Sequence, residues 1–139
     1  MPDLDPLVAE FLKEHRLCVL ATGRRDGSPQ QSLVAYHFDG TDFAISARAP
    51  SAKARNARRQ ERVSVAVADG SRVVVVYGRA RLVRDPEEVL RYNLTRLLPP
   101  RQQADVDRDA LARRLRDEDR VVIVVTPEKY LASRLEGRR

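Results

Sequence analysis

RVVVVYGRARLV, residues 72–83, predicts a long β-strand, because β-branched valines dominate its first half. Gly78 lies inside this run. A glycine within a strand is typical of a bulge or a sharp bend, since it has no side chain to pack. We therefore expect this strand to curl its sheet toward a barrel.

Shorter strand-like runs lie on both sides of this stretch. They are residues 17–22, 29–38, 42–46 and 63–68 upstream and residues 121–125 downstream. Asp26-Gly27, Asp39-Gly40 and Asp69-Gly70 predict tight hairpin turns between upstream runs. Hairpins imply antiparallel pairing, because parallel strands need a long crossover. The sequence thus predicts a mainly β (α+β) protein, a six-stranded antiparallel barrel with flanking helices.

Helical periodicity accompanies these strands. Residues 4–12 place apolar side chains on one helix face, with Asp3 or Asp5 as the cap. Asp85-Pro86 begins a second helical stretch that ends at Pro99-Pro100. Residues 101–119 are very polar and predict a weakly packed helix. Because no linker or repeat interrupts residues 1–139, we expect a single domain.

Composition narrows the class of protein. Apolar residues make up 42% and charged residues 33% of the chain, and no apolar run approaches the roughly 20 residues of a membrane span. The N-terminus lacks the features of a secretory signal. Cys18 is the single cysteine, which excludes an internal disulfide, and we expect it to be a small core residue. Together these observations predict a cytoplasmic protein with no membrane partner.

Common catalytic and metal-binding patterns are missing from the sequence. His15 and His37 lie far apart and, with one cysteine, do not make a usual zinc site. The sequence has neither a Gly-x-Ser-x-Gly elbow nor a glycine-rich phosphate loop. If the protein is an enzyme, a cofactor is expected to carry its reaction.

Residues 48–62 concentrate the positive charge. Six basic side chains there accompany one acidic side chain, so the segment holds +5 of the net charge of +6. Pro50-Ser51 is a common helix start, and the free N–H groups of a helix N-terminus favour an anion. Lys53 and Arg55 would lie in the first turns, which predicts a phosphate site for an anionic cofactor. For Arg58 and Arg59, the solvated face of a helix is an equally good interpretation.

Four stretches carry a resemblance to a known family. They are Leu20-Ala21-Thr22 with residues 26–32, residues 36–40, Ile45-Ser46 with residues 50–56, and residues 78–82. Their order and spacing, from about residue 6 to residue 127, resemble the pyridoxamine-phosphate-oxidase-like split-barrel flavoproteins. The chain is most similar to their deazaflavin branch, which uses coenzyme F420. The resemblance implies a split β-barrel of the FMN-binding type, and a homodimer with two cofactor sites at the subunit interface.

The resemblance also implies a set of cofactor-binding residues. Lys53, Arg55 and Asn56 match the motif that holds the phosphate, while Gln30 and Ser32 match positions facing the ring. Thr22 and Ser46 would line the same groove as Gln30 and Ser32. Ordinary strand polarity toward solvent is the alternative for Ser32 and Thr22. The complete expected set is Thr22, Gln30, Ser32, Ser46, Ser51, Lys53, Arg55, Asn56, Arg59 and Arg72.

The chain departs from the deazaflavin branch at one position. The resemblance implies an aromatic residue near the turn before the long strand, donated to the partner's site, but Ser71 or Arg72 stands here. Arg72 could instead stack its guanidinium or pair with a phosphate.

The charge pattern favours F420 over FMN, because F420 presents a phosphodiester and an oligoglutamate tail whereas FMN presents one phosphate. We therefore expect an F420-dependent oxidoreductase that transfers hydride to or from a small organic substrate. An FMN-dependent oxidase or reductase of the same fold is the alternative within enzymes. A non-catalytic protein that binds a flavin, a deazaflavin or a tetrapyrrole is the alternative outside them. Nucleic-acid binding is disfavoured, because no aromatic residue accompanies the basic cluster.

Overall fold

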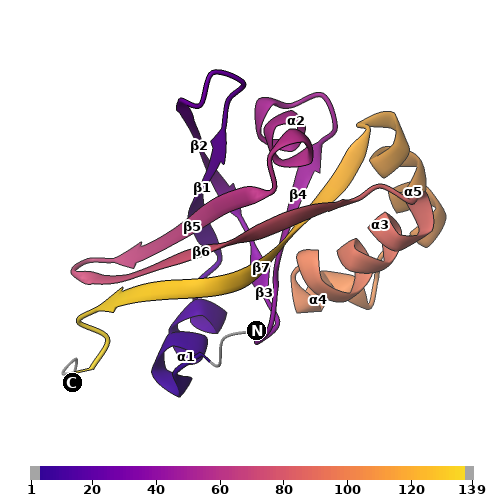
Figure 1. Cartoon of the computed structure of the whole chain (residues 1–139). Coiled ribbons are helices and arrows are strands. Elements are labelled where there is room, and N and C mark those ends of the chain that lie inside the picture. Colours follow the sequence, from indigo (N-terminus) through magenta and orange to yellow (C-terminus); the bar gives the residue numbers. More distant parts are fainter. Residues whose placement is uncertain (1–3, 137–139) are drawn as a thin grey trace.

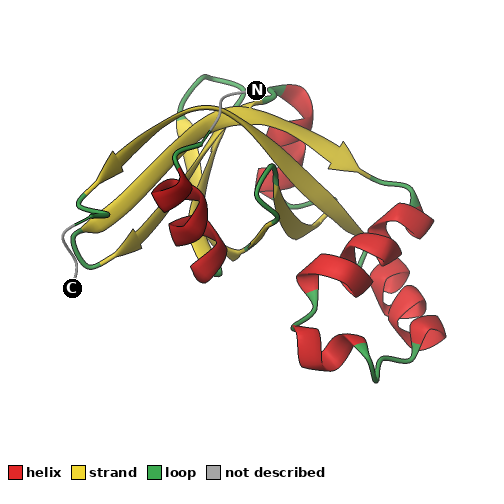
Figure 2. Cartoon of the chain, turned by 90° about the horizontal axis from the view of Figure 1, so that it is seen from below, coloured by secondary structure: helices red, strands yellow, loops and turns green. Residues whose placement is uncertain are grey.

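The computed structural model describes residues 4–136. Within these residues a seven-stranded antiparallel sheet runs in the order β2-β1-β5-β6-β7-β4-β3 and curls strongly (Figures 1 and 2). The strands are β1 (Leu17–Gly23), β2 (Pro29–Ala35), β3 (His37–Phe38), β4 (Phe43–Arg48), β5 (Arg62–Asp69), β6 (Arg72–Val83) and β7 (Arg120–Ser133). The predicted barrel with flanking helices is confirmed.

The helices are α1 (Pro6–Glu14), α2 (Ala52–Arg59), α3 (Pro86–Tyr92), the π-helix η1 (Asn93–Leu97), α4 (Pro100–Gln103) and α5 (Arg108–Asp117). Figure 2 shows the helix that follows the N-terminal trace beneath the arch of the sheet, and a separate group of helices at one end. Asp5 caps α1 as predicted, since its carboxylate accepts from the Leu7 N–H at 2.8 Å. Asp3, the alternative cap, lies outside the described residues.

The sheet has seven strands rather than the expected six, because residues 29–38 do not form one strand. They divide at Tyr36 into β2, which pairs with β1, and β3, which pairs with β4. The Tyr36 N–H donates to the Arg16 carbonyl at 2.8 Å, and its hydroxyl donates to the Leu12 carbonyl at 2.6 Å. Since β2 and β3 are the two ends of the strand order, Tyr36 joins the sheet's ends and closes the barrel.

The predicted irregularity at Gly78 is confirmed. The pairing of β6 with β7 shifts register between Tyr77 and Gly78. A Cβ atom on Gly78 would lie 2.3 Å from the Thr126 carbonyl oxygen, so the backbones approach there more closely than a side chain permits. Beyond this bulge β7 continues to Ser133, well past the predicted end at residue 125, because β6 offers it pairing partners along its whole length.

Two apolar clusters hold the elements together. The larger fills the barrel and includes Phe11, Leu20, Val65 and Ile123. The smaller lies between the other face of β4 and β7 and the helices α3 and α5; its buried members are Ala44, Val83, Val89, Leu111, Leu115, Val122 and Val124.

Residues 101–119, expected to form one helix, form α4 and α5 instead, and only α5 contributes buried leucines. Among the described helices, none has the length and apolarity to cross a membrane.

Candidate functional site

Helix α2 carries the basic cluster at one end of the barrel, beside the β1–β2 hairpin (Figure 1). Ser51 caps the helix, accepting from the Ala54 N–H at 3.4 Å and donating to the Arg48 carbonyl at 2.7 Å. Ala54 and Ala57 are buried at helical spacing, which turns Arg55 between them and the following Arg58 and Arg59 outward. Lys53 is half-buried, whereas Arg55, Arg58 and Arg59 are exposed.

Five of the predicted residues form one hydrogen-bonded network. The Thr22 hydroxyl donates to Gln30 Oε1 at 2.7 Å and accepts from Asn56 Nδ2 at 3.2 Å. Gln30 Nε2 donates to Ser32 Oγ at 2.9 Å, and Arg59 Nη2 donates to Asn56 Oδ1 at 3.2 Å. The network links β1, β2 and α2, so these polar groups are held in place before any ligand arrives.

The network runs from the interior to the surface: Asn56 and Thr22 are buried, Gln30 and Ser32 are half-buried, and Arg59 is exposed. Asn56 is 7% exposed and Thr22 is 3% exposed. Gln30 and Ser32 lie two residues apart and face the same side of β2, as their period-2 spacing requires. The alternative of ordinary strand polarity toward solvent therefore does not apply to Thr22.

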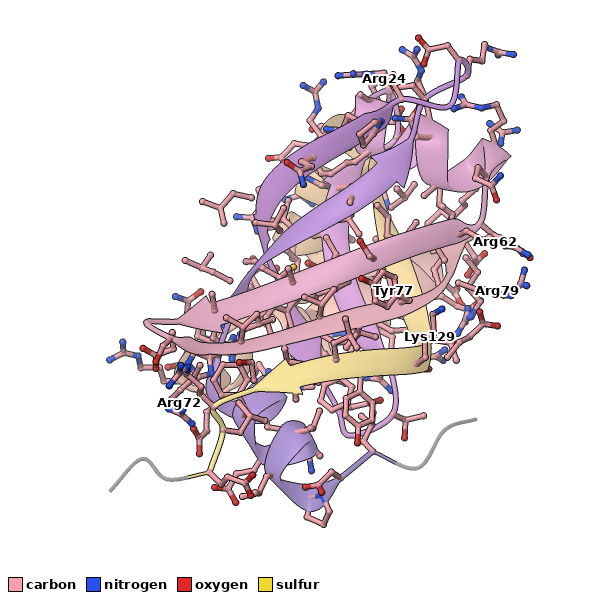
Figure 3. All side chains as sticks on the ribbon, turned by 60° about the vertical axis from the view of Figure 1, so that its left-hand side comes forward. Arg24, Arg62, Arg72, Tyr77, Arg79 and Lys129 are labelled. Atoms are coloured by element: carbon pink, nitrogen blue, oxygen red, sulfur yellow. The ribbon has the colours of Figure 1, made fainter. Side chains whose placement is uncertain are left out.

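A hollow of about 370 Å³ lies next to the network, lined by Arg25, Arg55, Arg58 and Arg59. We call it the arginine pocket. Arg25 comes from the β1–β2 turn and was not among the expected residues. The Arg24-Arg25 pair next to Asp26-Gly27 could have indicated it, because a tight turn presents its side chains at the end of the hairpin. Figure 3 shows the labelled Arg24 at this end of the molecule.

The charges around the arginine pocket lack acidic partners. Within residues 4–136, no carboxylate lies within 4.0 Å of the basic groups of Lys53, Arg55, Arg58 or Arg59. Some other arginines are neutralised: Arg79, for example, pairs with both Glu61 and Glu128. The site therefore keeps a positive potential, which attracts and steers anions.

Ser46 lies apart from the Thr22 network. It alternates along β4 with Ile45 and Ala47, which point into the barrel core, so it faces the opposite side. There it lines a hollow of about 180 Å³, and the other lining residues are Arg16, Ala35, Tyr36, Asn93 and Leu97. We call this the Ser46 pocket. Thr22 and Ser46 were expected to line one groove; within one chain Ser46 lines this pocket, and Thr22 belongs to the network beside α2.

Arg72 lies at the other end of the sheet from Arg24 (Figure 3). Its guanidinium stands over the Phe11 ring at 4.9 Å and lies 3.6 Å from the Asp69 carboxylate. These contacts fix the β5–β6 hairpin against α1. Within one chain, Arg72 is not brought together with α2.

The outer face of the sheet is apolar and open. Leu33, Val19, Ala66, Val75 and Leu131 are successive partners across β2, β1, β5, β6 and β7. Leu33 is 73% exposed and Leu131 is 63% exposed, and Leu17 and Tyr77 add further exposed apolar surface. Tyr77 and Lys129 mark this face in Figure 3, where the Lys129 ammonium lies 5.4 Å from the Tyr77 ring centre.

Burial shifts the pKa values of groups inside the barrel. Burial raises the pKa of the Cys18 thiol from 9.0 to about 12, which confirms its expected place in the core. Burial also raises the pKa of Tyr36. Arg59, a guanidinium that stays charged, is the one ionisable member of the network around Thr22, and its other members carry amide and hydroxyl groups. In the part of the chain that the structure describes, no group of three potential metal-ligand side chains gathers.

The architecture is a split β-barrel, and comparison with known proteins gives the family. The chain belongs to the family whose model is described as pyridoxamine 5'-phosphate oxidase, which matches residues 4–134. This family's fold binds flavins and supports oxidoreductase chemistry.

Solved structures share the fold. A conserved hypothetical protein from Mycobacterium tuberculosis is 24% identical with a TM-score of 0.74, covering 98% of this chain and 89% of that chain. An F420 reductase is 27% identical with a TM-score of 0.64, covering 88% of this chain and 94% of that chain. A Listeria innocua protein named after pyridoxamine 5'-phosphate oxidase is 19% identical with a TM-score of 0.65, covering 90% of this chain and 94% of that chain.

Proposed function

We propose that the protein is an oxidoreductase that uses coenzyme F420 to transfer hydride to or from a small organic substrate. The proposal depends on what we call the α2 site, which is helix α2 with the arginine pocket and the adjoining network around Thr22. There, cations without acidic partners in the described residues lie beside polar groups that are already hydrogen-bonded. The likeness to an F420 reductase at 27% identity supports the same choice.

The residues of the α2 site fit the anionic part of F420. Ser51 caps α2 while Lys53 lies half-buried in its first turn, and together with the helix N-terminus they suit a phosphodiester. The arginine pocket has four guanidinium groups, more than one phosphate needs. Guanidinium groups bind carboxylates through paired hydrogen bonds, so this pocket suits an oligoglutamate tail.

Each part of the site would have a distinct role. Lys53 and Arg55 would bind the phosphodiester, and Gln30 and Ser32 would present amide and hydroxyl groups to the edge of the ring. Asn56 holds the Thr22 hydroxyl in place from behind. The coenzyme, when bound, supplies the hydride chemistry, and the chain supplies orientation and charge.

The outer apolar face supports the proposed homodimer. An exposed apolar surface of this kind across five strands is typical of a protein interface. Arg72 stands near the position at which the family resemblance implies an aromatic residue for the partner's site, but its side chain lies on the α1 side of β6, so it would reach a partner only past the end of the β5–β6 hairpin.

An FMN-dependent oxidase or reductase is the second candidate. The family description favours it, because pyridoxamine 5'-phosphate oxidase names the family. A non-catalytic flavin, deazaflavin or tetrapyrrole carrier is favoured because the network around Thr22 offers amide, hydroxyl and guanidinium groups, none of which changes its charge near pH 7.

Fluorescence titration of the purified protein with F420 and with FMN tests the proposal. We expect saturable binding of F420 that is at least tenfold tighter than that of FMN, corresponding to about 1.4 kcal/mol. Tight FMN binding without a response to F420 would overturn the choice of coenzyme. Oxidation of reduced F420 by a general electron acceptor, measured on the same preparation, separates an enzyme from a carrier.

A further inference from the structure

The Ser46 pocket shares no lining residue with the arginine pocket and lies where the edge strand β2 comes close to β4. Ala35 comes from β2, Ser46 from β4, and Tyr36 is the residue that closes the barrel between them. Its volume of about 180 Å³ corresponds to about six water molecules at ~30 Å³ each. That space suits a small organic molecule.

One wall of this pocket is the π-helix η1. Asn93 begins η1 and Leu97 ends it, and both line the pocket. The Leu98 N–H donates to the Asn93 carbonyl at 3.0 Å, an i to i+5 bond. π-Helical turns are rare and frequently occur at functional sites.

Asn93 places a buried polar group at this wall. It is only 6% exposed, and its Nδ2 donates to the Val89 carbonyl at 2.8 Å. Ser46 adds a hydroxyl to the lining, while Ala35 and Leu97 make it partly apolar. The pocket thus combines apolar surface with a few fixed polar groups, as small-molecule sites do.

The charges near this pocket leave one cation uncompensated. Arg96 pairs with Asp39 at 3.0 Å. Arg16 lines the pocket, and within residues 4–136 no carboxylate lies within ion-pair distance of it. Its backbone is fixed, because the Arg16 carbonyl accepts the hydrogen bond from Tyr36.

The pKa of the neighbouring His37 reflects the same positive charges. Its pKa is lowered by burial and then by Arg16 and Arg96, although Asp39 acts in the opposite direction. His37 is therefore neutral at pH 7, and Arg16 remains the uncompensated charge of this region.

From these observations we propose that the Ser46 pocket binds the substrate, and that the substrate is a small organic carboxylate anchored by Arg16. A single uncompensated guanidinium matches a single carboxylate, to which it can donate two parallel hydrogen bonds. This inference rests on the proposed function, because only an enzyme has a substrate. Binding of a carboxylate in the pocket can still be measured without turnover.

Benzoate and its neutral counterpart benzamide are suitable probes. We would titrate each into isotope-labelled protein, with and without bound F420, and follow the amide NMR signals of Asn93 and Leu97. We expect benzoate to shift these signals saturably in the wild-type protein. We expect Arg16→Gln to weaken benzoate binding at least tenfold, and benzamide to bind wild-type protein correspondingly weakly.

Arg113→Gln is the matched control, because Arg113 is an exposed arginine of α5 that does not line this pocket. It should bind benzoate like the wild type. Arg16→Lys keeps the charge and should retain part of the affinity, which separates the charge from a loss of fold. Thermal unfolding of each variant checks that the barrel is intact.

Three results would overturn the inference. The first is that benzoate leaves the Asn93 and Leu97 signals unmoved. The second is that Arg16→Gln binds benzoate as tightly as wild type. The third is that Arg16→Gln weakens F420 or FMN binding as strongly as benzoate binding, which would assign the pocket to the coenzyme. If neither coenzyme binds while benzoate binding still depends on Arg16, the pocket stands and the proposed function falls.

Discussion

Lys53 is the half-buried cation in the first turn of α2, next to the Ser51 cap. Its ammonium has no carboxylate within ion-pair distance in the described residues, so removing it breaks no ion pair of the fold. Lys53 is placed to contact a ligand and contributes little to the core. Its substitution should therefore change coenzyme binding without changing the stability of the fold.

Lys53→Ala should weaken F420 binding roughly tenfold, or about 1.4 kcal/mol, because one charge-assisted contact to the phosphodiester is lost. The midpoint of thermal unfolding should stay unchanged. Fluorescence titration and a melting curve on the same sample measure both. Lys13→Ala, which removes an exposed lysine from α1, is the control; equal affinity of Lys53→Ala and wild type would place the phosphate elsewhere.

Cys18 is buried among apolar side chains, and burial holds its pKa at about 12 rather than 9.0. The thiolate is the reactive form, so at pH 8 the native thiol should react with Ellman's reagent far more slowly than the unfolded thiol. We expect full labelling in guanidinium chloride and almost none in the native protein over the same time. Rapid native labelling would show that β1 opens to solvent.

The same shift has a consequence for stability. Below pH 9 the Cys18 thiol is protonated in both the folded and the unfolded protein, so its contribution to the free energy of unfolding is fully present. As the pH rises from 9 toward 12, the unfolded thiol loses its proton while the folded one keeps it. The free energy of unfolding should therefore fall over this range, to an extent that Cys18→Ala would remove.

At the scale of elements, the bulge between β6 and β7 shapes the barrel. Both strands are longer than the others, and the register shift at Gly78 lets them bend without losing their pairing. The close approach of the Thr126 carbonyl leaves no room for a side chain at this point.

Gly78→Ala should destabilise the fold by about 1–3 kcal/mol, because the added methyl group would overlap the Thr126 backbone. Urea unfolding followed by circular dichroism measures this change. Gly23→Ala is the matched control in β1, since a Cβ there would meet only the Gln60 side chain at an ordinary 3.8 Å. Equal stability of the two variants would contradict the role assigned to the bulge.

The whole molecule presents two surfaces to which we have assigned proposed roles, the α2 site and the outer face of the sheet. One end of the barrel carries α2 and the Thr22 network, and the outer face carries exposed leucines on β1, β2 and β7. If two copies meet on the outer face, their contact shields these leucines from water, which stabilises the pair.

Leu33→Glu places a charge on that face, at its edge strand β2, and should convert the proposed dimer to a monomer. Analytical ultracentrifugation of wild type and variant measures the change. Leu7→Glu, on α1, also removes an exposed leucine and should leave the mass unchanged. A wild-type protein that sediments as a monomer at micromolar concentration would contradict the dimer, and with it any role of Arg72 in a partner's site.

The sequence was sufficient for features with a local cause. Alternating apolar residues and Asp-Gly turns set the antiparallel strands, and Pro50-Ser51 set the start of α2. Gly78 indicated the bulge, because a glycine within a strand is typical of a bulge, a bend or a close approach of two backbones. The basic charge of α2 followed from its residues directly, since helical spacing turns Lys53 and Arg55 away from the buried alanines.

Contacts between distant segments were decided only by the tertiary structure. Period-2 alternation gives the face of each strand, but not which strands become neighbours once the sheet closes at Tyr36. Arg25 therefore joins α2 around the arginine pocket, while Ser46 turns toward Arg16 and η1 instead of Thr22. The reason is physical: local propensity fixes dihedral angles, whereas barrel closure depends on burying the valines of β5 and β6 together with those of β7.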